Sequence, residues 1–72
     1  MIEPVSIPFP EDFERWKNSF SEKLKEIGGE FGIDTLSVNI VKDNETNELR
    51  LKEVLNATSI VADQVVAAFL TA

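Results

Sequence analysis

The side chains that could do chemistry in this chain are carboxylates, lysines and hydroxyls, because the sequence contains no histidine, cysteine or tyrosine. That composition excludes Ser-His and Cys-His nucleophilic catalysis, and zinc, copper or haem sites of the usual kinds. Paired carboxylates could still do acid–base work, but they need a cleft that desolvates them. A chain of 72 residues has little room for such a cleft. We therefore expect no enzyme, no catalytic residue, no cofactor and no small-molecule substrate.

Two short segments look like ligand-binding loops but depart from them at the deciding positions. Residues 43–48, DNETNE, carry oxygen side chains in series, as a calcium loop does. The sixth position is Glu48 where an EF-hand requires glycine, and the twelfth is Val54 where it requires glutamate. Residues 28–32, GGEFG, follow a helical pattern, whereas a phosphate-binding loop opens a helix after a strand. We therefore expect no metal and no phosphate at either segment.

The charge of the chain limits its direct partners. Acidic residues outnumber basic ones 13 to 7, which gives a formal net charge of −6. DNA, RNA and anionic lipid all require a basic face, so we expect none of them as a direct partner, whereas a protein partner is allowed. The start of the sequence has no basic region typical of a signal peptide, and the apolar stretch at the end is too short and polar to span a bilayer. These features predict a cytoplasmic protein.

Residues 11–28 carry the clearest helical pattern. Pro10 suits the first position of a helix, and Gly28-Gly29 suits a left-handed stop. Trp16 lies in the middle of the apolar stripe, so we expect it in the core. The stripe, with spacings of three and four residues, consists of Phe13, Trp16, Phe20, Leu24 and Ile27.

Residues 35–53 alternate as two strands. Leu36, Val38 and Ile40 fall on one face of the first strand, and Leu49 and Leu51 on one face of the second. The intervening DNETN segment has no glycine, so we expect a loop longer than two residues. Residues 1–10 contain three prolines and form an extended arm with a possible edge strand.

Residues 58–70 predict a second helix that is apolar over most of its surface. Asn56, Thr58 or Ser59 could cap it. Its apolar arc is wider than a hairpin and one helix can cover, and such a surface usually marks an interface. We therefore predict a protein–protein interface on this helix, formed in a homodimer or with a partner protein. The candidate interface residues are Val61, Val65, Val66 and Phe69.

Together these patterns predict one small α+β domain of order α-β-β-α, with both helices on one face of an antiparallel hairpin. The segments IVKDNETNELRL and NATSIVAD resemble the hairpin and capped helix of small phage head–tail joining proteins. We expect a non-enzymatic, acidic interaction module that acts as an adaptor, inhibitor or accessory subunit. The alternatives are an acidic inhibitor of a nucleic-acid-binding protein, such as a phage anti-defence factor or an antitoxin, and a virion assembly subunit.

Overall fold

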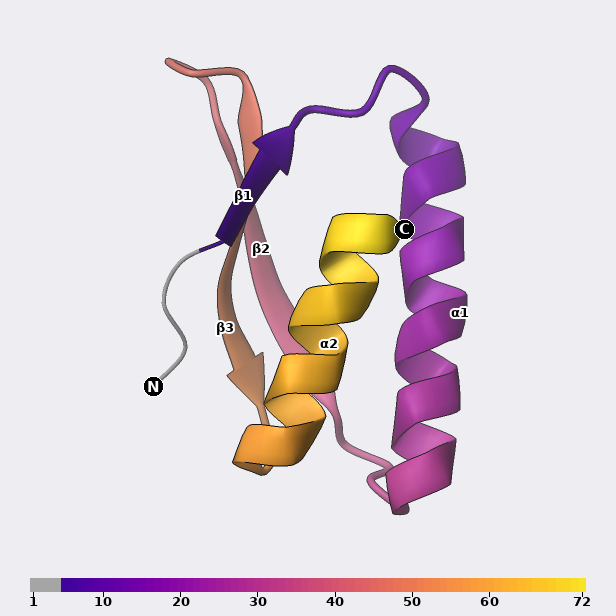
Figure 1. Cartoon of the computed structure of the whole chain (residues 1–72). Helices are drawn as coiled ribbons and strands as arrows, with labels where there is room; N and C mark the ends of the chain where they lie inside the picture. The colour runs from indigo at the N-terminus through magenta and orange to yellow at the C-terminus, as the bar shows by residue number, and fades with distance from the viewer. Residues whose placement is uncertain (1–4) are drawn as a thin grey trace.

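A computed structural model describes residues 5–72, which form a two-layer α+β domain (Figure 1). Residues 1–4 of the expected arm lie outside the described range. The order of elements is β-α-β-β-α, so a strand precedes the expected α-β-β-α core. The elements are β1 (Val5–Pro8), α1 (Phe13–Phe31), β2 (Ser37–Asp43), β3 (Glu48–Leu55) and α2 (Ser59–Thr71).

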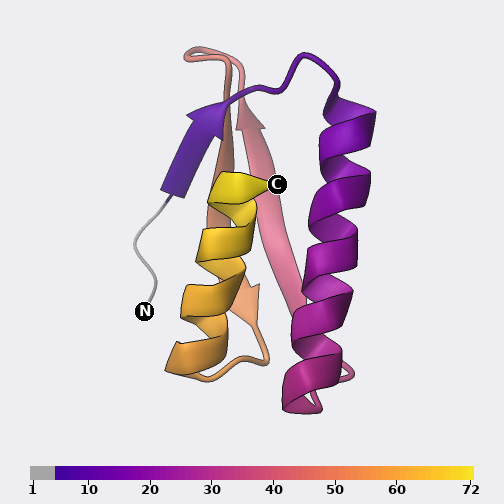
Figure 2. The same cartoon turned by 45° about the vertical axis from the view of Figure 1, so that its right-hand side comes forward.

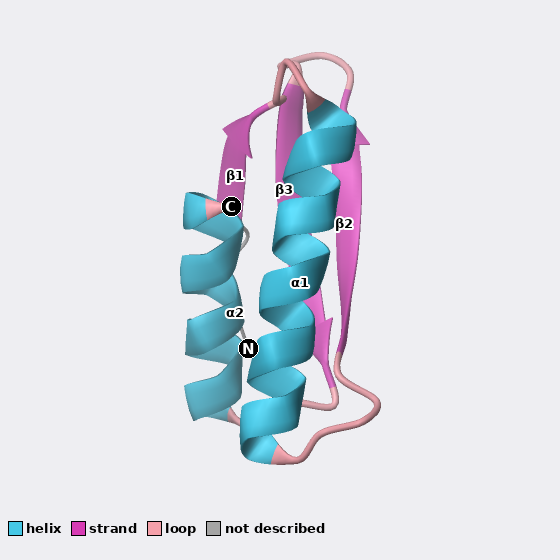
Figure 3. Cartoon of the chain, turned by 90° about the vertical axis from the view of Figure 1, so that its right-hand side faces the viewer, coloured by secondary structure: helices cyan, strands magenta, loops and turns pink. Residues whose placement is uncertain are grey.

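The strands form one antiparallel sheet in the order β1-β3-β2. Both helices lie on the same face of this sheet, α2 near β1 and α1 near β2, as Figure 3 shows. The expected packing of two helices on one face of a hairpin is therefore confirmed, and the possible N-terminal edge strand is β1. The strand β1 pairs Val5 with Leu51 and Ile7 with Leu49, so it widens the sheet beneath α2.

The helix α1 begins at Phe13, two residues later than expected. Asp12 is its N-cap, and the Asp12 side chain accepts a hydrogen bond of 3.1 Å from the backbone N–H of Arg15. A carboxylate in this place accepts a hydrogen bond from a backbone N–H that has no partner within the helix. Its negative charge also interacts favourably with the positive end of the helix dipole. Pro10 therefore precedes the helix and does not occupy its first position.

The expected stop at Gly28-Gly29 is wrong, because α1 continues to Phe31 and closes at Gly32. Gly32 has φ 68° and ψ 33°, the left-handed conformation that a helix end uses. The backbone N–H groups of Gly32 and Ile33 both donate to the carbonyl of Gly28, the second at 2.8 Å. Gly28 is needed for a different reason, since a Cβ there would lie 2.9 Å from the carbonyl oxygen of Ile33.

The hairpin has a four-residue loop, 44–47, as the lack of glycine predicted. Asn47 takes a left-handed φ of 56°, which asparagine tolerates better than most residues. The register shifts between Asn39 and Ile40, so that Lys52 has no partner on β2. This bulge resets the alternation of β3 and allows Leu51 and Val54 both to pack on the core.

The helix α2 covers the centre of the sheet and lies beside α1 (Figure 2). Thr58 is its N-cap, with the hydroxyl accepting from the N–H of Val61 at 3.4 Å. At the other end, the Nζ of Lys23 donates to the carbonyl and the hydroxyl oxygens of Thr71 at 3.0 and 3.1 Å. Lys23 thus ties the end of α2 to the middle of α1.

Candidate interaction surfaces

The structure places the four candidate interface residues of α2 mostly in the core. Val61, Val65 and Phe69 are 1%, 0% and 0% exposed, and Val66 is half-buried. The sheet and α1 therefore already cover the three fully buried side chains, and a partner of the folded chain cannot touch them. The wide apolar arc is covered mainly by α1 and the sheet, with Phe69 packed edge-on against Trp16 and Phe20 of α1.

The outer face of α2 keeps a narrower apolar stripe. Ile60 is 66% exposed and Leu70 is 53% exposed, and Ala67 lies between them on the same side of the helix. Asp63 and Gln64 share this face and keep it partly polar. Self-association through α2 stays a prediction, and these are the residues through which it would act.

The two edges of the sheet differ in how well they are protected. The edge strand β1 has four residues and ends in Pro8, which has no N–H to offer. The opposite edge strand β2 has seven residues and contains no proline. Short length and proline are devices that block the addition of a further strand. The strand β2 has neither, and its own protection is limited to the inward-pointing Lys42 and the bulge beside Ile40. We therefore call β1 the closed edge and β2 the more open one.

The hydrogen-bonding direction along β2 follows from the register. The N–H of Phe9 donates to the carbonyl of Asn47 at 3.1 Å, which continues the β1–β3 ladder by one pair. Because antiparallel ladders alternate, Leu49 and Leu51 turn their backbone groups toward β1, and Arg50 turns its groups toward Val41 of β2. The N–H and C=O groups of the neighbouring residue Ile40 consequently point to the open edge, as do those of Val38 and Lys42.

A groove of about 550 Å³ runs between α1 and this open strand. We call it the α1–β2 groove. One wall is α1, the floor comes from the inward side chains of β2 and from Leu49 of β3, and Phe9 lines the groove near the hairpin. The residues that line it are Phe9, Phe13, Trp16, Lys17, Phe20, Ser21, Leu24, Val38, Ile40, Lys42 and Leu49.

Aromatic rings give the α1–β2 groove a rigid wall. Phe9, Phe13, Trp16 and Phe20 stack in sequence with centroid distances of 5.0, 6.1 and 5.3 Å. Phe69 of α2 packs edge-on against Trp16 and Phe20, at 5.4 and 5.8 Å. Trp16 is 8% exposed, as expected of a core residue. One side of this row of four rings therefore packs against the core, and the other side lines the groove.

The charged residues of the α1–β2 groove are both lysines. The Nζ of Lys42 lies 4.4 Å from the centroid of the Phe9 ring, a cation–π contact. The Nζ of Lys17 lies 3.9 Å from a carboxylate oxygen of Glu14, with both side chains largely exposed. Such an exposed pair contributes little and can exchange partners. The described residues that line the groove include no aspartate or glutamate, although acids prevail in the chain as a whole.

A second hollow of about 470 Å³ continues the α1–β2 groove toward the C-terminal end of α1. The two hollows share Ser21 and Leu24, and the second extends to Gly29 and Leu36, with Lys25 and Asp34 as its charged residues. From Phe13 to Gly29, α1 rises about 24 Å at 1.5 Å per residue. The two hollows together are therefore elongated along the helix.

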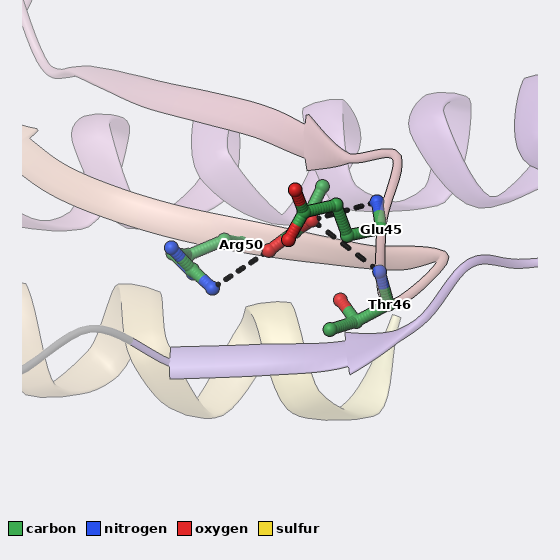
Figure 4. Close-up of polar contacts among 4 residues, drawn as sticks. Glu45, Thr46 and Arg50 are labelled. Carbon is green, nitrogen blue, oxygen red and sulfur yellow. Dashed lines mark hydrogen bonds and ion pairs between the residues drawn. The ribbon is translucent and has the colours of Figure 1, made fainter.

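The hairpin tip is held by one carboxylate, that of Asp43. Its Oδ1 accepts from the backbone N–H groups of Glu45 and Thr46 at 2.9 and 3.3 Å, and its Oδ2 accepts from Arg50 at 3.1 Å (Figure 4). These backbone N–H groups, with the Arg50 charge as a smaller cause, hold the pKa of Asp43 below its ordinary value of 3.8. Partial desolvation opposes the shift without cancelling it. The side chain of Asp43 is thus engaged in building the turn.

Within residues 5–72, no group of three or more acidic side chains is placed to hold a metal ion. None of the helices in this range is both long and apolar enough to cross a membrane.

Comparisons with protein-family models, with curated proteins and with solved structures gave no match to this chain.

Proposed function

We propose that this chain is a non-enzymatic protein–protein interaction module, and that its open edge strand β2 accepts a strand from another protein. The observation that supports the proposal is the contrast between the two edges. The strand β1 is short and ends in Pro8, whereas β2 offers outward backbone groups at Val38, Ile40 and Lys42. A long edge strand without proline can act as a template for strand addition, in which main-chain hydrogen bonds supply much of the affinity.

The test removes one outward donor without changing any side chain. A chain of 72 residues is accessible to chemical synthesis, so an N-methyl group can be placed on the backbone nitrogen of Ile40. The matched control carries the N-methyl group on Ser6, whose N–H points outward from the closed β1 edge by the same alternation. Circular dichroism should show both proteins folded, because neither nitrogen bonds within the sheet.

The three synthetic proteins are then used to capture partners from a lysate of the source cells. We expect the unmodified protein and the Ser6 control to retain a shared set of proteins that the Ile40-methylated protein loses. Equal capture by all three proteins, or no capture by any, would overturn the proposal.

A further inference from the structure

We propose that the α1–β2 groove and the β2 edge together bind an extended peptide segment of a partner protein, apolar on alternate residues and carrying at least one carboxylate. The inference rests on the proposed function and specifies the partner's chemistry. It follows from the shape of the groove, the position of the open backbone groups and the sign of the charges beside them.

The shape favours a peptide over a compact small molecule. Small-molecule sites are enclosed and bury most of their ligand. Here the two hollows run for about 24 Å along α1, which matches about seven residues of extended chain at ~3.3 Å per residue. The strand β2, with seven residues, has the same length. An added strand would therefore be paired along the whole of β2, beside the hollows that run above that strand.

The alternation of a strand supplies the apolar side chains. Val38, Ile40 and Lys42 turn their side chains toward the helices and their backbone groups toward the open edge. A strand bonded to this edge projects every second side chain over the same layer, toward the partly exposed Phe13 and Leu24 of the α1 wall. Those side chains should be apolar, whereas the alternate ones face solvent on the other side of the sheet.

The charges favour a carboxylate near the hairpin end of the groove. Lys42 lies on its floor beside Phe9, and Lys17 lies on its α1 wall. An apolar wall strengthens the attraction between these ammonium groups and an anion that approaches them. A second copy of this chain fits less well, because its own β2 would bring a further lysine, Lys42, into the groove in place of a carboxylate.

The experiment uses a displayed library of random decapeptides, selected on the unmodified protein without any bias toward acidic sequences. We expect the enriched peptides to alternate apolar residues and to carry aspartate or glutamate. Their affinity should fall about tenfold or more for Lys17→Glu/Lys42→Glu. It should also fall for the Ile40 N-methyl protein. The charge-matched control is Arg15→Glu/Lys52→Glu, which changes the net charge equally outside the groove and should bind as the unmodified protein does.

Several outcomes would overturn the inference. These are a selection that enriches nothing, enriched peptides without acidic residues, or equal losses for the groove and control variants. Binding that depends on the Ile40 N–H but not on Lys17 and Lys42 would refute the carboxylate while the proposed function stands. If Lys17→Glu/Lys42→Glu were unfolded by circular dichroism, Lys17→Glu alone decides the question, because that side chain is 55% exposed.

Discussion

Two positions near the end of α1, Gly28 and Gly32, should accept only glycine because of the local backbone geometry. Gly28→Ala should destabilise the protein, because the new Cβ would lie 2.9 Å from the backbone oxygen of Ile33, which cannot move without opening the helix end. Gly32→Ala should also destabilise it, because φ of 68° is strained for any residue with a side chain. Thermal unfolding followed by circular dichroism measures both losses.

The neighbouring glycine provides the control. Gly29 is helical and exposed, with nothing within 4 Å of an added Cβ. Gly29→Ala should therefore raise the stability by about 0.5–1 kcal/mol, because alanine loses less conformational entropy in a helix. A loss of stability on Gly29→Ala, or a gain on Gly28→Ala, would show that the close approach between Gly28 and Ile33 does not decide this helix end.

Asp43 makes the stability of the hairpin tip depend on pH. Its pKa is lowered in the folded state, so its stabilising contribution is present above the unfolded value of about 3.8 and is lost as the pH falls through the lower folded pKa. Asp43→Asn keeps an oxygen for the turn but removes the charge beside Arg50. The stability difference between the two proteins should therefore be largest at neutral pH and shrink below pH 3.8.

Denaturant unfolding at pH 7, 5 and 3 measures this difference. Glu45→Gln is a suitable control, because Glu45 enters the turn through its backbone N–H. Its effect on the free energy of unfolding should change less with pH than that of Asp43→Asn. The same pH dependence for both variants would contradict the role of Asp43.

At the scale of elements, the two faces of α2 should differ sharply in their tolerance of charged substitutions. The buried face should not accept them, and the exposed face should. Val65→Asp should abolish the fold, because it places an unpaired carboxylate where the side chain is 0% exposed. Ile60→Asp should leave the circular dichroism spectrum and melting temperature close to those of the unmodified protein, because Ile60 is 66% exposed. A folded Val65→Asp variant would mean that α2 can detach from the sheet.

The order and type of the main elements could be predicted, because each carries a strong local pattern. The stripe through Phe13, Trp16 and Phe20 predicts α1, and the alternation around Ile40 predicts β2. The end of α1 could not be placed, since a glycine needed for close packing and one needed for a left-handed turn have the same sequence signature. Only tertiary contact separates Gly28 from Gly32.

The candidate site was harder to predict than the fold. The wide apolar arc of α2 suggested an interface because the sequence does not show that β1 enlarges the sheet beneath it. The α1–β2 groove was missed, although one signal was present. The alternation Leu36, Val38, Ile40 continues to Lys42, so a lysine falls on the apolar face of the strand. A charge at an inward position is typical of an edge strand, so Lys42 indicates that β2 lies at an edge of the sheet.

At the scale of the whole molecule, the remaining prediction is self-association. We expect light scattering to detect a dimer at high micromolar concentration, because Ile60 and Leu70 leave an apolar stripe on the outer face of α2. The variant Ile60→Lys/Leu70→Lys should be folded and monomeric. The helix α2 lies near β1, at the edge of the sheet opposite to β2 (Figure 3). The Ile40 N-methyl protein should therefore still dimerise. A monomeric unmodified protein would refute self-association.

The pairing of β1 with β3 also has a kinetic consequence. Ile7 meets Leu49 only after the chain between them, including α1 and β2, has closed a long loop, whereas the β2–β3 hairpin closes over four residues. Contacts of large sequence separation form late, so β1 should dock after the transition state of folding. Ile7→Ala should accelerate unfolding in stopped-flow measurements and leave the refolding rate nearly unchanged. The strand that closes one edge of the sheet would then be the first to leave the folded protein.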